Sequence, residues 1–144
     1  MPDTNKPFFT NDLNYNIEDL KKLPFTPEDF VCKCGCGKCN FNPITLGKLA
    51  LMVTLAQTKE YDIDWHIDSA CRCESHNRNE GGAHDSAHLT GQAVDLAAPD
   101  SRHRFWILRI ALLAGFNRAG LSKVGYFIHL DDAEYKDPNV IWLY

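Results

Sequence analysis

The chain has 144 residues, which is enough for one domain with a single hydrophobic core and too few for two. With 44% apolar and 24% charged residues, its composition is that of a folded protein and not of a disordered one. The formal charge of −4, without any run of Lys and Arg among aromatics, argues against nucleic acid as a partner. No segment approaches the ~20 apolar residues of a membrane-spanning helix, so we expect no membrane insertion.

The N-terminal part, residues 1–25, is polar with scattered apolar positions. We expect an extended arm there, with at most a short helix near residues 17–23. Thr26 followed by Pro27 is a helix-start signal, but the cysteine- and glycine-rich stretch that follows forces a loop. The sequence therefore predicts a helix of one turn at this point.

Residues 26–144 are expected to form one α+β domain, with two main helices and a mixed or antiparallel sheet. Asn42-Pro43 starts an amphipathic helix that runs to about Thr58. Asp100-Ser101 starts a second helix, which is apolar nearly all round up to Gly115 and should be largely buried. Strand-like patterns cover residues 64–70, 92–97, 124–130 and 140–144, and residues 74–87 look like a polar loop.

Six cysteines form two groups, Cys32-x-Cys34-x-Cys36-x-x-Cys39 and Cys71-x-Cys73. Three states fit them: reduced thiols, a disulfide between the groups, or a structural zinc site with unusually tight spacing. We expect at least one disulfide from the first group to Cys71 or Cys73, which would hold Arg72 between two constrained neighbours.

A histidine and an aspartate flank Gly91. His88 ends the polar loop and Asp95 lies on the next strand, so a turn at Gly91 can bring both to one ion; a straight strand would hold them over ~20 Å apart. His129, an imidazole in an apolar strand, is the third candidate ligand. Taken singly, each is better explained as a hydrogen-bonded core residue. Together, two imidazoles and a carboxylate leave one position of a zinc ion for water, as in catalytic zinc sites.

The string Ser86-x-His88-x-x-Gly91-x-Ala93-x-Asp95, followed by a later His in an apolar strand, resembles the signature of the M15 family of zinc peptidases. That family includes D-Ala-D-Ala carboxypeptidases, L-alanyl-D-glutamate endopeptidases and phage endolysins. The resemblance extends over residues 28–132 and includes three further segments: Phe30-x-Cys32-x-Cys34-Gly35, Ser69-Ala70-Cys71-Arg72-Cys73-x-x-His76-Asn77 and Gly81-Gly82-Ala83.

The resemblance implies a fold like that of hedgehog and DD-peptidase domains, with Zn²⁺ bound by His88, Asp95 and His129. Arg72 stands where the family has an arginine that engages a substrate carboxylate or the carbonyl oxygen as it becomes charged, roles that suit a guanidinium fork. Ser86 would help to orient the site and bind substrate. His84, in the adjoining loop, is a further candidate for substrate contact, the alternative being a solvated loop residue.

One position departs from the family pattern. Many members have an acidic general base three residues before the third ligand, where this chain has Tyr126. The nearest acid is Asp131, two residues after His129 and so on the same face of a strand. We predict that Asp131 is the catalytic base that takes a proton from zinc-bound water; the alternative is a partner that orients His129.

The expected function is therefore hydrolysis of peptidoglycan stem peptides by a zinc-activated water. By analogy we favour L-alanyl-D-glutamate endopeptidase over D-Ala-D-Ala carboxypeptidase activity. Two alternatives lack this reaction: a zinc-bearing module that binds wall peptides without cutting them, and a cysteine-based zinc module for protein or nucleic-acid interaction, against which the acidic charge argues.

We expect a monomer whose partner is the stem peptide. The polar N-terminus lacks the apolar segment of a secretory signal. Because the substrate lies outside the inner membrane, we expect release through a holin or another non-classical route to the periplasm or the exterior.

Overall fold

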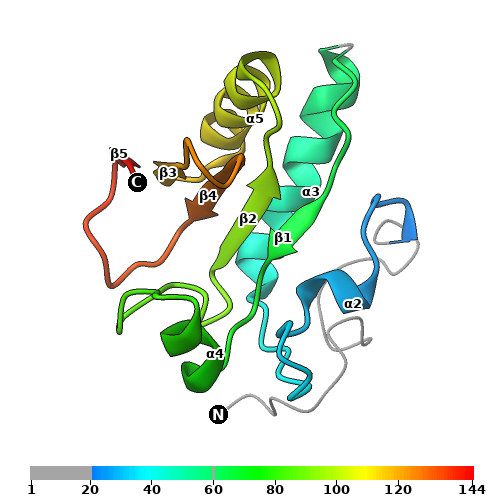
Figure 1. Cartoon of the computed structure of the whole chain (residues 1–144). Coiled ribbons are helices and arrows are strands. Elements are labelled where there is room, and N and C mark those ends of the chain that lie inside the picture. The colour runs from blue at the N-terminus through cyan, green and yellow to red at the C-terminus, as the bar shows by residue number, and fades with distance from the viewer. Residues whose placement is uncertain (1–20, 60) are drawn as a thin grey trace.

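A computed structural model describes residues 21–59 and 61–144 of the chain. The expected N-terminal arm, and most of the short helix expected near residues 17–23, lie outside the described residues. The described part is one small α+β domain, as predicted (Figure 1). Its elements are α2 (Pro27–Phe30), α3 (Pro43–Thr58), β1 (Ile67–Ser69), α4 (Glu74–Asn79), β2 (Ala93–Ala97), α5 (Ser101–Ala114), β3 (Arg118–Leu121), β4 (Phe127–Asp131) and β5 (Val140–Leu143).

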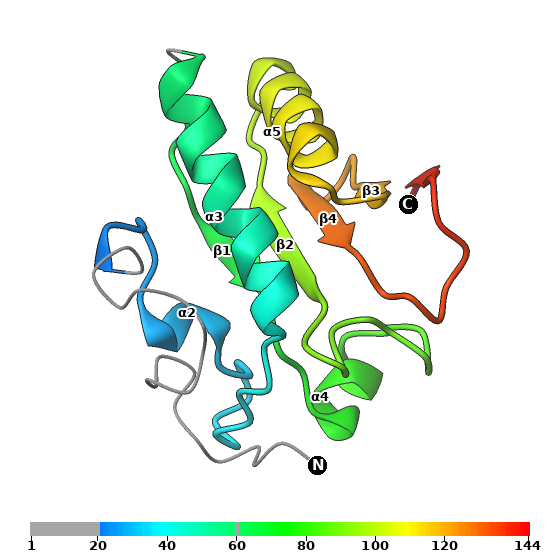
Figure 2. The same cartoon turned by 180° about the vertical axis from the view of Figure 1, so that it is seen from behind.

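The five strands form one mixed sheet in the order β1-β2-β4-β3-β5. The pairs β1–β2, β2–β4 and β3–β4 are antiparallel, whereas β5 runs parallel to β3. The two long helices, α3 and α5, lie side by side across one face of the sheet (Figures 1 and 2). Every helix in the described ranges is too short or too polar to cross a lipid bilayer.

The helix-start signals act as the sequence predicts. The side chain of Asn42 accepts hydrogen bonds from the backbone N–H groups of Ile44 and Thr45, at 2.8 and 3.3 Å, at the start of α3. The Asp100 carboxylate accepts one from the N–H of His103, at 2.8 Å, at the start of α5. The helix after Thr26 has the single turn expected of it.

Two elements were not expected from the sequence, α4 and β3. The six residues of α4 are polar, so no apolar periodicity marks them as a helix. Strand β3 has only four residues, and Gly120 interrupts the alternation that would reveal it.

The core lies between the sheet and the two long helices. Val94 and Leu96 of β2 and Ile128 and Leu130 of β4 are all buried in it. Because side chains alternate along a strand, Asp95 and His129 project from the opposite face. The expectation that α5 would be largely buried was wrong for its outer side, where Phe105, Leu112 and Leu113 are exposed.

Candidate functional site

The site is built on two neighbouring strands and the loop before them. Asp95 on β2 and His129 on β4 are direct partners in the antiparallel register. His88 reaches them from the loop that precedes β2. Gly91 turns that loop with φ of 69°, and a Cβ atom at this position would overlap the carbonyl oxygen of Asn40. The turn expected between His88 and Asp95 is thus confirmed, and only glycine fits it.

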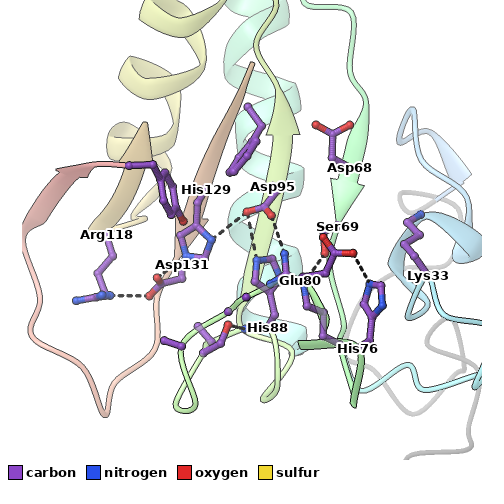
Figure 3. A pocket seen from close by; sticks show the side chains of 18 of the residues that line it. Lys33, Asp68, Ser69, His76, Glu80, His88, Asp95, Arg118, His129 and Asp131 are labelled. Carbon is purple, nitrogen blue, oxygen red and sulfur yellow. Dashed lines mark hydrogen bonds and ion pairs between the residues drawn. The ribbon is translucent and has the colours of Figure 1, made fainter. Parts of the chain in front are cut away.

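The three predicted ligand residues converge on one point (Figure 3). Oδ1 of Asp95 lies 3.2 Å from Nε2 of His88 and 3.0 Å from Nδ1 of His129. One ligand atom from each residue lies within 4.8 Å of the others, and all three side chains are buried. Two imidazoles and a carboxylate at this separation form a donor set that zinc accepts.

The ring nitrogen of each imidazole that does not face Asp95 has a hydrogen-bond partner of its own. Nδ1 of His88 is 2.6 Å from the carbonyl oxygen of Ala70, so this nitrogen carries the proton and Nε2 is left to bind a ligand. Nε2 of His129 is 2.7 Å from Oδ2 of Asp131. Partners of this kind fix the orientation and tautomer of metal-binding histidines.

The charges of the three residues depend on one another. Burial alone would raise the pKa of Asp95, but the adjacent imidazoles of His88 and His129 hold it well below its ordinary value. Burial lowers the pKa of His88 despite the nearby carboxylate, which favours the neutral form of this imidazole. Burial also acts to lower the pKa of His129, but its hydrogen bonds to Asp131 and Asp95 raise it.

Asp131 is almost fully buried behind His129. Its second oxygen, Oδ1, pairs with Nε of Arg118 at 2.8 Å and accepts a hydrogen bond from the N–H of Ala133 at 3.3 Å. Burial would raise the pKa of Asp131, but His129 and Arg118 lower it. These contacts fit the alternative role of orienting His129, whereas its role as the general base stays a prediction.

Arg72 lies on the other side of Asp95. Its guanidinium donates to three groups: Oδ2 of Asp95 at 3.1 Å, Oγ of Ser69 at 3.0 Å and Oδ1 of Asn77 at 3.4 Å. Its backbone N–H donates to the carbonyl oxygen of His88 at 3.1 Å. The arginine is therefore fixed beside the candidate metal site at both its backbone and its side chain.

A cavity of about 670 Å³ opens over this site and is lined by the three candidate ligands, Arg72 and Asp131. Its size is in the range of small-molecule and peptide pockets. Ser86 also lines it, and its Oγ accepts a hydrogen bond from the N–H of His88 at 3.3 Å. The structure does not bring His84 there, because this side chain is exposed and is not among the lining residues.

The sequence predicted no role for three residues of the site: Asn77, which lies in the family motif, Arg118 and Trp142. The Trp142 ring packs against the His129 ring, with centroids 5.4 Å apart. It passes over Gly120, where a Cβ atom would come within 2.6 Å of the indole. An arginine and a tryptophan in short strands carry no motif, so only the register of β3, β4 and β5 reveals their place.

The expected disulfide was wrong. All six cysteines are free thiols. The first group does lie against Cys73, but Sγ of Cys34 is 3.7 Å from Sγ of Cys73 and 3.5 Å from Sγ of Cys32. A disulfide requires about 2.05 Å. The sequence correctly placed the two groups together but not their chemical state.

Comparison with known proteins agrees with this geometry. A family model described as Peptidase M15 matches residues 23–131, which include every candidate ligand, Arg72 and Asp131. No curated protein matched the chain closely enough to be identified as a relative. Because the family match spans well over half of its length, the chain belongs to the M15 family of peptidases.

Proposed function

We propose that this peptidase depends on zinc and hydrolyses the stem peptides of bacterial peptidoglycan, with the bond between L-Ala and D-Glu as its preferred target. The observation that supports the proposal most is the convergence of His88, Asp95 and His129 beside a cavity that all three line. Family membership supports peptide hydrolysis, and peptidases of this family are generally metal dependent.

The three ligand residues suit zinc in the chemistry of their donor atoms and in the way their side chains are already held in place. The donor set holds two nitrogens and one oxygen, and each imidazole already has its other nitrogen engaged, by Ala70 or by Asp131. The two imidazole rings therefore need little reorientation when zinc binds. A zinc ion bound there would supply a Lewis acid that polarises the scissile carbonyl and lowers the pKa of water.

The cavity offers cationic partners to the carboxylates of a peptide. Four cationic side chains line it, those of Lys33, Arg72, Arg118 and Lys136, beside four acidic ones, those of Asp68, Glu80, Asp95 and Asp131. Arg118 is paired with Asp131, and Lys136 lies 3.2 Å from Asp85. Stem peptides carry several carboxylates, which a guanidinium fork binds in bidentate fashion.

Arg72 and Asp131 have different roles in this proposal. Arg72 binds a substrate carboxylate or the carbonyl oxygen as negative charge develops on it, because its guanidinium lies at the site and lines the cavity. Asp131 holds the imidazole of His129 in place and keeps Nδ1 directed at the site. We assign Asp131 this orienting role in preference to that of the base.

The test is digestion of a muramyl pentapeptide by the zinc-loaded protein, with mass spectrometry of the products. Endopeptidase cleavage after L-Ala gives muramyl-L-Ala and a free tetrapeptide, whereas carboxypeptidase cleavage gives muramyl tetrapeptide and alanine. A chelator should stop either reaction. The His88→Ala variant should lose the zinc ion of this site together with hydrolysis, while His103→Ala, on α5 away from the site, should keep both.

The outcomes separate the alternatives. Release of the free tetrapeptide supports the proposal in full, and release of alanine alone replaces the preferred bond with the terminal D-Ala. Intact substrate that stays bound to the zinc-loaded protein would instead identify a binding module.

A further inference from the structure

Four of the six cysteines gather in a second cluster outside the candidate active site. Cys32, Cys34 and Cys36 come from the loop after α2, and Cys73 lies at the start of α4. Their sulfur atoms all lie within 4.8 Å of one another. Cys34 and Cys36 are exposed, so packing in a hydrophobic core does not account for them.

Two of the sulfur–sulfur separations match tetrahedral coordination. With zinc–sulfur bonds of ~2.3 Å, the sulfurs of a regular tetrahedron lie about 3.8 Å apart. Sγ of Cys34 lies 3.5 Å from Sγ of Cys32 and 3.7 Å from Sγ of Cys73. Both are far longer than a disulfide bond and close to this tetrahedral edge.

Backbone N–H groups point at three of the four sulfurs. The N–H of Lys38 donates to Cys36 at 3.4 Å, that of Cys73 to Cys32 at 3.4 Å, and that of His76 to Cys73 at 3.3 Å. Donors of this kind stabilise the thiolate form, which is the form that binds metal. The surrounding backbone is therefore arranged for sulfur anions and not only for neutral thiols.

The remaining two cysteines form a separate pair. Cys39 hydrogen bonds with Cys71 and is not a member of the four-sulfur group. Cys71 is fully buried, and its backbone N–H donates to the carbonyl oxygen of Phe30. Cys39 therefore offers a matched control: a cysteine of the same loop that does not belong to the cluster.

We propose that Cys32, Cys34, Cys36 and Cys73 bind a second zinc ion with a structural role. Four protein ligands leave no position for water or substrate, which is the hallmark of structural zinc sites. The ion ties the loop after α2 to the start of α4. This site is distinct from the one formed by His88, Asp95 and His129, and does not depend on what that site cleaves.

The cluster stands directly beside the cavity. Lys33 lies between two of its cysteines and Arg72 immediately precedes the fourth, and both side chains line the cavity. The second zinc therefore fixes the backbone from which two of the four cavity cations project. Loss of this ion should loosen substrate binding without removing the active-site metal.

The first test is metal analysis of the full chain, purified with a reductant and without a chelator. We expect two zinc ions per chain. Cys36→Ser, an exposed substitution, should reduce the content to one, His88→Ala should also leave one, and the double variant should leave none. Cys39→Ser should keep both ions, and circular dichroism with thermal unfolding should confirm that each variant is folded.

Replacement of zinc by cobalt reports the metal ligands directly. Because the unaltered protein can be used, this test remains valid even if a cysteine variant fails to fold. The unaltered protein and His88→Ala should both show intense sulfur-to-cobalt charge-transfer absorption, because thiolates remain bound to the metal. The proposal is overturned if that absorption is missing, if Cys36→Ser keeps the zinc content of the unaltered chain, or if the four cysteines of the purified protein are joined by disulfides.

Discussion

His129 and Asp131 share one face of β4, and Oδ2 of Asp131 lies 2.7 Å from Nε2 of His129, the ring nitrogen that does not face Asp95. The other carboxylate oxygen pairs with Arg118, the cross-strand neighbour of Asp131 on β3. A chain of contacts thus runs from Arg118 through Asp131 to His129. It holds the imidazole in the one orientation that directs Nδ1 at the candidate metal site.

Asp131→Asn tests this chain of contacts. The amide keeps the shape of the side chain but removes its charge, so the hold on His129 weakens. Substitution of such partners costs about 10–100-fold in metal affinity or activity. We expect zinc affinity and peptide hydrolysis to fall together by that factor, as measured by competition with a chromophoric chelator and by product formation.

Asp64→Asn, an exposed carboxylate outside the cavity, is the matched control and should change neither quantity. If Asp131→Asn bound zinc normally and still lost hydrolysis, the orienting role would be wrong and the predicted general base would be favoured. Full turnover with normal zinc binding would exclude both roles.

Arg72→Lys should separate substrate chemistry from metal binding. Lysine keeps the positive charge but cannot reproduce three separate contacts with Ser69, Asn77 and Asp95. We expect the zinc content to be unchanged and hydrolysis to fall by roughly 10²–10³, the usual cost of losing a donor to a developing oxyanion.

The matched control for this substitution is Arg78→Lys, on the exposed side of α4. It should hydrolyse the muramyl peptide at the rate of the unaltered protein. Unchanged hydrolysis by Arg72→Lys would remove this residue from the catalytic assignment.

Zinc binding should strengthen as pH rises. Hydrogen bonds to Asp131 and Asp95 raise the pKa of His129, so in the metal-free protein this imidazole holds a proton that zinc must displace. Affinity should therefore increase with pH up to the raised pKa and then level off. Isothermal titration calorimetry in buffers of different ionisation enthalpy would measure the released proton.

The stability of the metal-free protein should fall as pH rises, whereas zinc affinity increases. Because the pKa of His129 is higher in the folded than in the unfolded state, its proton stabilises the fold. This contribution is fully present below the ordinary histidine pKa of about 6.5 and is lost as pH rises through the raised value. Asp131→Asn lowers the pKa of His129, so both pH profiles should shift to lower pH; unshifted profiles would contradict the assignment.

The sequence was sufficient for those parts of the site that depend on local patterns. Two strand-like patterns correctly placed Asp95 and His129 on strands, and Gly91 marked the turn that returns His88 to them. The motif placed Arg72 near the same point. Alternation and turns are set by neighbouring residues, which is why they can be recognised without a structure.

Non-local pairing could not be predicted in the same way. Arg118 and Trp142 reach the site only because β3 pairs with β4 on one side and with β5 on the other. Spacing suggested that Asp131 was a base, but the position of Arg118 behind it favours an orienting role. The chemical state of the cysteines could not be predicted either. Sulfur–sulfur distances distinguish a disulfide from a set of metal ligands, and the spacing of cysteines along the sequence does not determine those distances.

Gly91→Ala should destabilise the fold more than the same change at another glycine with positive φ. Gly91 and Gly81 have φ of 69° and 71°, so alanine costs about 1–2 kcal/mol in either backbone. At Gly81 a new Cβ meets nothing within 4 Å, whereas at Gly91 it overlaps the backbone of Asn40 and Phe41. Such overpacking adds roughly 1–3 kcal/mol.

Urea unfolding of the metal-free proteins measures the difference without a contribution from zinc binding. We expect Gly91→Ala to lose the sum of the two costs, about 2–5 kcal/mol, and Gly81→Ala only the first. Gly91→Ala should also lose zinc affinity, because the loop that carries His88 must move away from Asn40 to admit the methyl group. Equal destabilisation by the two substitutions would show that this loop can move away from Asn40 without loss of stability. The close approach at Gly91 would then not be what holds His88 against Asp95.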